Sequence, residues 1–177
     1  LGPSQKSAII NKLRDNKVLT TETIVMDPVY IAADIGVIPT GESADYTLKD
    51  KTKLQLTRRS TSTRSAESIK NNTYNIIKNH FNNFNLGQDI ELTSLNTDVL
   101  NIEGVKSINT VNIDTGKAIN GISLLLWNPV YEHEDVSITT SNVSVDFFKC
   151  VYLNDPAGFL DKIEVVSEST STGTVEY

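Results

Sequence analysis

The stretch SAESIKNNTYNIIKNHFNNFNLGQ, residues 65–88, decides the fold class because it holds the clearest helical pattern in the chain. Its apolar residues recur at intervals of three and four, which places them on one face of an α-helix. Gly87 stands where a helix often ends in a left-handed cap. We therefore predict a long amphipathic helix that packs by this face. The predicted apolar face consists of Ile69, Thr73 or Tyr74, Ile76, Ile77, His80 or Phe81, and Phe84.

Strands are predicted on both sides of this helix. Residues 29–38 alternate with a period of two and are largely apolar on both faces, which indicates a long inner strand. Residues 51–58 predict a second, half-exposed strand. After the long helix, residues 93–100 predict a short helix. Residues 105–113 predict a strand whose alternation slips once, as it would at a β-bulge near residues 107–109.

The remainder of the chain predicts a run of short strands. Asp114-Thr115-Gly116-Lys117 is a turn signal, and Asn120-Gly121 is a strong hairpin dipeptide. A first helix is predicted at residues 4–16, with Ser4 as its cap. This order of helices and strands is typical of an α+β fold and not of a strictly alternating α/β fold. The four short strands are expected at residues 122–127, 136–140, 143–153 and 159–166.

We divide the chain into four parts from these patterns. The first residues, Leu1-Gly2-Pro3-Ser4, contain neither an initiator methionine nor a signal peptide, so we expect a fragment of a longer polypeptide. The parts are an N-terminal helix and connector at 1–22, an α+β core at 23–115, a β-rich extension at 116–167 and a flexible tail at 168–177.

The composition argues against several classes of protein. Among 177 residues there are 22 acidic and 16 basic side chains, a net charge of -6, and 52 residues of Ser, Thr and Asn. A single cysteine forbids an internal disulfide and fits a reducing compartment. The acidic balance argues against nucleic acid as a partner, because phosphate binding needs many Lys and Arg. The longest apolar run, near residues 122–127, is far shorter than the roughly 20 residues of a membrane-spanning helix.

Few side chains suit catalysis or metal binding. His80 and His133 are the only histidines, and Cys150 is the only cysteine. Neither the zinc-binding His-Glu-x-x-His pattern nor a glycine-rich phosphate-binding motif occurs. The run Glu132-His133-Glu134-Asp135 contains groups that can hold a cation or tune a general base, although such a run is more often a solvated rim. We therefore predict no enzyme, no cofactor, and no catalytic, cofactor-binding or metal-binding residue.

Charge is divided unevenly along the chain. Residues 49–64 carry six basic side chains and one acidic side chain, whereas residues 132–177 carry nine acidic and two basic ones. Complementary segments of this kind can steer association between copies or with a neighbouring subunit. Two unrelated solvated faces would produce the same counts, so both interpretations stay open.

Three segments follow one another in the chain: NHFNNFNLGQDI (79–90), LTSLNTDVLNI (92–102) and EGVKSINTVNI (103–113). Together they resemble the baseplate J family of contractile injection machines. In that family a helix leads through a glycine and an apolar position to a short helix and then to a Gly-Val strand. The preceding strand pair, DPVYIAADIGV and KTKLQLTRR, is also similar, so the resemblance covers roughly residues 1–114. The matching positions are Phe81, Phe84, Gly87, Ile90, Leu95, Ile102, Gly104, Val105 and Ile108.

The whole chain, with its Asn and Ser richness, is most similar to the C-terminal part of a baseplate wedge protein of T-even contractile-tailed bacteriophages. This resemblance implies a structural protein of the virion's tail baseplate, assembled in the host cytoplasm. Two copies would pair within each wedge, and wedges would join into a sixfold ring around the central hub. Other wedge subunits would be the partners. The family carries no reaction chemistry, so the resemblance implies no catalytic residue and no small-molecule substrate.

Interface residues are predicted among side chains that the core does not need and in the basic segment. They are Tyr74, Trp127, Tyr131, Arg58, Arg59 and Arg64. Two other functions stay open. A β-rich carbohydrate- or receptor-binding module of a phage tail would use Trp127, Tyr131 and Tyr152 as a stacking platform. A hydrolase would depend on the run at residues 132–135 alone.

Overall fold

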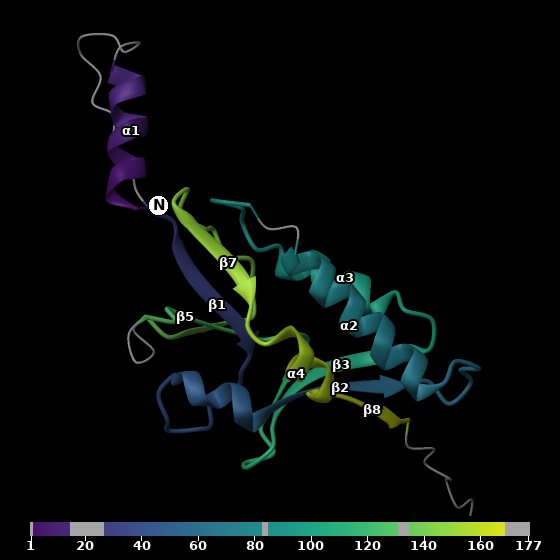
Figure 1. Cartoon of the computed structure of the whole chain (residues 1–177). Helices are drawn as coiled ribbons and strands as arrows, with labels where there is room; N and C mark the ends of the chain where they lie inside the picture. The colour runs from purple at the N-terminus through teal and green to yellow at the C-terminus, as the bar shows by residue number, and fades with distance from the viewer. Residues whose placement is uncertain (1, 15–26, 83–84, 131–134, 169–177) are drawn as a thin grey trace, which may run out of the picture.

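The computed structural model describes residues 2–14, 27–82, 85–130 and 135–168, and within these ranges the strands form two four-stranded sheets (Figure 1). Sheet A has the strand order β6 (Ser137–Thr139), β5 (Leu124–Trp127), β1 (Val29–Ile35) and β7 (Lys149–Leu153). Sheet B has the order β4 (Ala118–Asn120), β3 (Val105–Asn112), β2 (Thr52–Arg58) and β8 (Ile163–Ser167). The helices are α1 (Pro3–Arg14), α2 (Ala66–Asn82), α3 (Leu92–Leu100), α4 (Pro156–Asp161) and the 3-10 helix η1 (Tyr46–Lys51). The predicted α+β fold is confirmed.

Each sheet combines strands from distant parts of the chain. β1 pairs antiparallel with β5, where Ala33 lies opposite Leu126, and parallel with β7, where Ile31 lies opposite Val151. β2 likewise pairs antiparallel with β3 and parallel with β8. The boundary that we predicted at residue 115 therefore falls inside sheet B. Residues 116–167 do not form a separate extension, because they supply β5 and β7 to β1 and β8 to β2.

Helix α2 covers both sheets. It contacts β7 of sheet A and β8 of sheet B, and it also contacts α3 (Figure 1). Its buried residues are Ile69, Thr73, Ile77 and Phe81, at the helical spacing that the sequence predicts. Thr73 is accommodated there because its hydroxyl donates to the carbonyl of Ile69 at 2.9 Å. Phe84, the last position of the predicted apolar face, lies outside the described residues.

The core has two parts that lie on opposite faces of sheet A. The larger cluster joins both sheets to α2, α3 and α4, and it includes Ala33 and Ile35 of β1. The smaller cluster contains Ala32, Leu48, Leu125 and Trp127 and lies against η1. Because successive side chains of a strand point to opposite faces, β1 contributes to both clusters. This explains why residues 29–38 are apolar on both faces.

Two predicted turns have different roles from those expected. Residues 113–117 form the hairpin turn between β3 and β4, whereas Asn120-Gly121 is no hairpin. Instead, Gly121, with φ 84°, lies where the chain leaves sheet B to enter sheet A. Gly87 has the positive φ that we predicted, 69°, but it lies five residues beyond the end of α2.

Helix α4 occupies part of the segment predicted as a strand at residues 159–166. Asp155 caps it by accepting from the N–H of Gly158 at 3.1 Å, and Pro156 begins it. The strand in this segment starts only at Ile163. The β-bulge expected near residues 107–109 lies one position earlier, at Lys106, where the register between β2 and β3 shifts.

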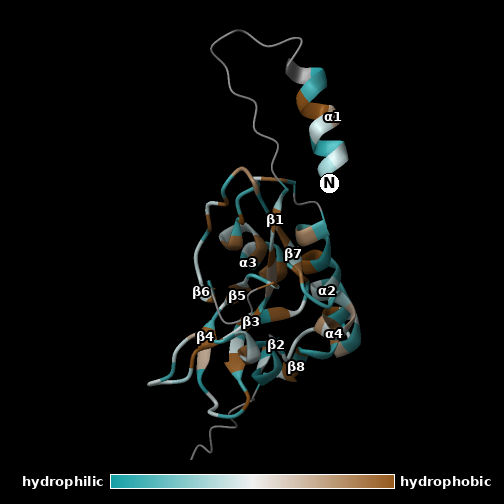
Figure 2. Cartoon of the chain, turned by 60° about the vertical axis from the view of Figure 1, so that its left-hand side comes forward, coloured by the Kyte–Doolittle hydropathy of each residue, from teal (hydrophilic) through white to brown (hydrophobic). Residues whose placement is uncertain are grey.

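Helix α1 projects away from both sheets (Figures 1 and 2). From Pro3 to Lys12 every side chain is exposed except Lys6, which is half-buried and forms an ion pair with Asp27. In the described part of the chain, no helix combines the length and the apolar character that crossing a membrane requires.

Candidate interaction surface

An apolar surface lies at the end of sheet A where β1 and β7 begin. Eight large apolar side chains are exposed among the described residues, and four of them are at this end. We call these four the apolar end: Tyr30 (54% exposed), Leu86 (54%), Val130 (75%) and Phe147 (79%). Four exposed large apolar side chains at one end of a sheet make this end the strongest candidate for binding another molecule.

Backbone hydrogen bonds bring the segments of Tyr30, Leu86 and Phe147 together. The N–H of Val29 donates to the carbonyl of Phe148 at 2.9 Å, which joins the segments before β1 and β7. The N–H of Gly87 donates to the carbonyl of Lys149 at 2.9 Å, which adds the segment after α2. The surface therefore depends on main-chain pairing between distant segments, not on side-chain packing alone.

Ring contacts extend this surface along β1 and β7. The rings of Phe147 and Phe148 meet edge to face with their centroids 5.3 Å apart. Tyr30 and Tyr152 make a similar contact at 6.4 Å. Edge-to-face pairs fix the relative orientation of the rings, so the apolar end presents an ordered aromatic surface.

Gly87 allows the chain to approach Phe147 closely. A Cβ atom at this position would lie 2.7 Å from the Cα of Phe147, which is shorter than any normal contact. The φ of Gly87, 69°, also favours glycine. The glycine thus has a role that we did not predict, since it sets the position of the most exposed ring in the surface.

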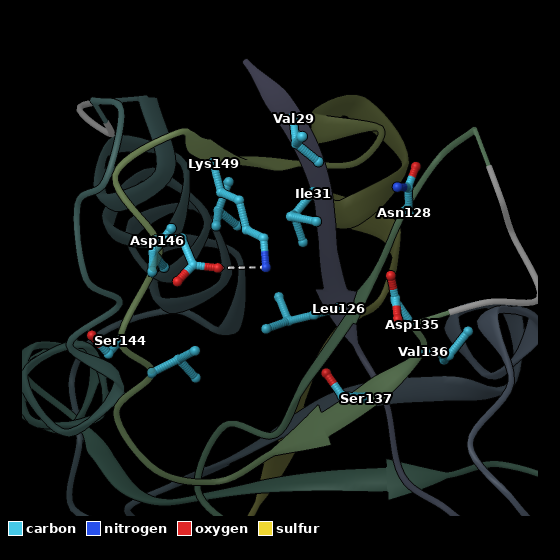
Figure 3. Close-up of a pocket in the computed structure, with 13 residues that line it drawn as sticks. Val29, Ile31, Leu126, Asn128, Asp135, Val136, Ser137, Ser144, Asp146 and Lys149 are labelled. Atoms are coloured by element: carbon cyan, nitrogen blue, oxygen red, sulfur yellow. Dashed lines mark ion pairs between the residues drawn. The ribbon is translucent and has the colours of Figure 1, made fainter. Parts of the chain in front are cut away.

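A pocket of about 410 Å³ opens near the start of β1 and β7, on the face of sheet A to which Val29 and Ile31 point (Figure 3). Val29, Ile31 and Leu126 supply apolar side chains from β1 and β5, while Asn128 and Ser144 are among its polar lining residues. All five side chains are drawn in Figure 3, and they come from three different segments of the chain. The pocket therefore combines an apolar base with hydrogen-bonding groups.

The charged groups of this pocket are an ion pair and a carboxylate. Lys149 Nζ lies 2.7 Å from Asp146 Oδ2 (dashed line in Figure 3), and Asp135 also lines the pocket. Asp135 has a φ of 55°, which is uncommon for a residue other than glycine. Within the described ranges, no group of three or more His, Cys, Asp or Glu side chains is placed to hold a metal ion.

The expectation that Trp127 is free of the core is wrong. It is only 3% exposed and belongs to the cluster with Ala32, Leu48 and Leu125. It cannot take part in the predicted interface or stacking platform without disrupting that cluster. Tyr131, which we also predicted for both the interface and the stacking platform, lies outside the described residues, as do Glu132, His133 and Glu134.

Tyr74 and Tyr152 are half-buried. Tyr74 packs partly against the larger core cluster, and Lys78 Nζ lies 5.6 Å from the centroid of its ring. Tyr152 packs against the smaller cluster and contacts Tyr30 at the apolar end. Of the aromatic side chains in the described ranges, Tyr30 and Phe147 are the most exposed, and neither was among our predicted site residues. The sequence gives little indication that these two side chains are exposed, because each stands beside apolar residues that belong to a strand.

The three predicted arginines bind groups of their own chain. A guanidinium nitrogen of Arg58 donates to the carbonyl of Ser62 at 2.8 Å, and Arg59 Nε donates to the carbonyl of Val105 at 3.1 Å. Arg64 pairs with Glu103 at 2.9 Å, with both side chains mostly exposed. The structure thus gives each arginine a local role and places none of the three beside the apolar end.

Two lysines of the basic segment also pair within the chain. Lys49 lies 3.0 Å from Asp50, and Lys51 lies 3.6 Å from Asp114. The positive charge of residues 49–64 is therefore partly balanced by nearby carboxylates. This arrangement agrees better with a solvated face than with a docking surface.

His80 lies half-buried on α2 beside a small polar pocket. Burial lowers the pKa of His80, and the charges of Asp98 and Glu91 offset part of this effect. Asp98 comes from α3, so sequence spacing within the long helix did not reveal it. The ring also meets Phe81 edge to face at 5.6 Å, as a partly packed helix residue does.

Asp34 and Lys162 form a buried ion pair that we did not predict. Lys162 Nζ lies 2.5 Å from Asp34 Oδ2, and the Asp34 side chain is 1% exposed. Burial raises the pKa of Asp34 above its ordinary value, and the charge of Lys162 and its hydrogen bond offset part of that rise. The pair joins β1 of sheet A to the segment between α4 and β8, so it has a structural place far from the apolar end.

Comparison of the chain with protein-family models, with curated proteins and with solved structures finds no match.

Proposed function

We propose that this chain is a structural subunit of a contractile-tail baseplate wedge in a bacteriophage. In this proposal it pairs with a second copy and helps to join wedges into a sixfold ring around the hub. Its other partners are wedge subunits, and its location is the virion after assembly in the host cytoplasm. The proposal includes no catalysis, cofactor, nucleic acid, membrane insertion or small-molecule substrate.

One observation supports an assembly role above the others, namely the apolar end. Phe147 and Val130 are more than two-thirds exposed although both are large and apolar. Burial of apolar surface contributes roughly 25 cal/mol per Å², so leaving these side chains in water forgoes a gain that a partner would supply. The resemblance of roughly residues 1–114 to the baseplate J family supports the same role. Within that family we propose a likeness to the C-terminal part of the wedge protein encoded by gene six of T-even phages.

The first test is the mass of the chain in solution. Two copies of the 19.5 kDa chain give a particle of about 39 kDa, which light scattering distinguishes from a monomer. A chain that stays monomeric at high concentration would contradict pairing. The second test is a reconstruction of contractile tails that contain the protein, with a labelled antibody against this chain. Label on the fibres, the sheath or the capsid, and none on the baseplate, would contradict the proposed location.

A second candidate function, a carbohydrate- or receptor-binding module of a phage tail, is supported by the pocket of about 410 Å³ at the start of β1 and β7. Exposed rings stack on sugars, and the amide of Asn128 and the hydroxyl of Ser144 can hydrogen-bond to sugar hydroxyls. Trp127 has no part in this version because it is buried. A glycan array probed with the whole chain tests it, and an array without any bound glycan would remove it.

A further inference from the structure

The base of the pocket at the start of β1 and β7 is the open margin of the larger core cluster. Leu126 and Val151 belong to that cluster, and Ile31, Val143 and Val145 pack partly against it. These five side chains are aliphatic, and in the described part of the chain no aromatic ring lines the pocket. Removal of apolar surface from water is favourable, so an alkyl chain that lies on this base would extend the core.

The described lining residues include three charged groups, and two of them neutralise each other. Lys149 pairs with Asp146 at 2.7 Å. Asp135 has no hydrogen bond or ion pair of its carboxylate within the described ranges. Figure 3 shows Asp135 on the side of the pocket across from that pair, with Ile31 and Leu126 between them. The pocket thus keeps one uncompensated negative charge, which attracts a cation and repels an anion.

The pairing of β5 with β6 places Asp135 next to the apolar base. Leu126 lies opposite Ser137, and Asp135 precedes Ser137 by two residues, at the end of this strand pair. The Ser137 hydroxyl lines the same pocket and can accept a hydrogen bond. An ammonium group carries three donors and no acceptor, so a carboxylate and a hydroxyl are suitable partners for it.

We infer that this pocket binds an aliphatic chain that ends in a cation, with the chain on Ile31 and Leu126 and the cation beside Asp135. A lysine side chain of another protein has this chemistry, and so does a free alkylamine. The volume of about 410 Å³ lies within the roughly 300–1,000 Å³ of small-ligand sites. The inference does not depend on pairing of copies, because none of the four residues of the apolar end lines the pocket.

Three small probes with similar alkyl chains test the role of charge. They are n-hexylammonium, n-hexanol and hexanoate, which at neutral pH carry a positive charge, no charge and a negative charge. Each is titrated into the isotope-labelled whole chain, and the amide chemical shifts of the lining residues give the dissociation constant. We expect hexylammonium to bind about fivefold more tightly than hexanol, as one ion pair in water allows, and hexanoate to bind most weakly. Propylammonium should bind more weakly than hexylammonium, because it covers less of the aliphatic base.

A matched pair of variants tests the role of Asp135. Asp135→Asn removes the charge and keeps the backbone, because asparagine tolerates a φ of 55° as aspartate does. We expect this variant to bind hexylammonium about fivefold more weakly than the native chain and to bind hexanol equally well. The control is Asp161→Asn, which removes an exposed carboxylate from α4, beyond the other end of β7, and should change neither affinity.

Several results would overturn the inference. Equal affinities of hexylammonium and hexanol for the native chain would do so, and so would equal effects of the two variants. Chemical shift changes outside the pocket, or no binding of any probe, would also overturn it. A neutral sugar that binds the native chain and Asp135→Asn with the same affinity would assign the pocket to the second candidate function instead. Because the probe series uses the native chain, it decides the matter even where a variant does not fold.

Two further probes distinguish the sources of the cation. Butylammonium has the alkyl chain of a lysine side chain, and N-acetyl-lysine N-methylamide adds the flanking peptide groups. Binding of both probes supports a lysine side chain of another protein as the ligand. Binding of butylammonium alone supports a free alkylamine, because the peptide groups then collide with the rim of the pocket.

Discussion

The two ends of β1 differ in burial and in role. From Ala32 to Ile35 every residue is buried, and this closed end holds both core clusters and the Asp34–Lys162 ion pair. At the other end Tyr30 is exposed and, with Phe147, belongs to the apolar end. One strand of seven residues thus joins a region built for stability to a region available for association. An apolar strand can therefore be buried in the core over only part of its length, and its sequence alone does not show which part.

The largest expected effect is at the closed end. Trp127→Ala removes a ring that is 3% exposed and leaves a cavity among Ala32, Leu48 and Leu125, so we expect a loss of roughly 3–5 kcal/mol of unfolding free energy. Urea unfolding followed by far-ultraviolet circular dichroism measures it, since Trp127 is the only tryptophan and its fluorescence is lost in the variant. A loss below about 1 kcal/mol would mean that the smaller cluster can collapse around the gap.

The second effect concerns the buried ion pair. Lys162→Met leaves the Asp34 carboxylate without its cation, and we expect a loss of about 3 kcal/mol near neutral pH. The control is Arg64→Ala, which breaks the exposed pair with Glu103 and should cost less than about 1 kcal/mol. Equal losses of unfolding free energy in the two variants would show that solvent screens the charge of Asp34 as strongly as it screens a surface charge.

The same pair predicts a dependence on pH. The pKa of Asp34 is raised on folding from an ordinary value of 3.8, so the stability gained from its protonation is fully present below that value. It is lost as pH rises through the folded-state pKa. Lys162→Met removes the cation that holds this pKa down. The unfolding free energy of the variant is therefore expected to be closest to that of the native chain near pH 4 and to fall further below it towards pH 7. Unfolding curves at several pH values measure the difference in unfolding free energy between the two chains. A difference that does not change with pH would contradict the raised pKa of Asp34 as its cause.

A smaller effect is expected at Gly87, behind the apolar end. Gly87→Ala brings a Cβ to within 2.7 Å of the Phe147 Cα at a positive φ, so we expect a loss of about 1–3 kcal/mol. The control is Gly116→Ala, which has a similar φ of 70° but open space around its Cβ. The difference between the two variants isolates the contact with Phe147, and no difference would mean that this segment shifts freely.

The smallest effect on stability is expected at Phe147 itself. Phe147→Ser changes a side chain that is 79% exposed, so the unfolding free energy should stay within about 0.5 kcal/mol. The same variant should weaken pairing of copies, which light scattering measures. A large loss of stability without any change in pairing would reverse our comparison and assign this end of β1 to the core.

The sequence predicts the helices and strands of this fold better than it predicts which strands pair with one another. The apolar positions from Ile69 to Phe81 predict α2 because the period of three and four residues is long and regular. α4 was missed since its six residues are too few to show that period, and Phe159 and Leu160 continue into the apolar pattern of β8. The pairing of β1 with β7 leaves no local signal, because the two strands are far apart in the chain.

The candidate site was harder to predict than the fold. Trp127 ends a continuous apolar run, and such a run indicates burial on both faces of a strand, so the sequence contained evidence against its exposure. Asp34 also had a signal, since an acidic residue inside an apolar strand needs a partner. The identity of that partner, Lys162, depends on how sheet B packs against sheet A, and sequence reasoning cannot supply it. Phe147 is exposed because nothing in its own chain covers it, which only the three-dimensional arrangement reveals.

The parallel pairing of β1 with β7 has a consequence for synthesis of the protein. Val29 lies opposite Lys149, so a ribosome must add 120 further residues before the first strand of sheet A meets its parallel neighbour. At roughly 5–20 residues per second this wait is on the order of 10 s, during which the apolar run of β1 lacks that neighbour. β2 waits similarly for β8. Nascent chains of this protein should therefore depend on chaperones until β7 has been translated, and any truncation before residue 149 leaves β1 with an open edge.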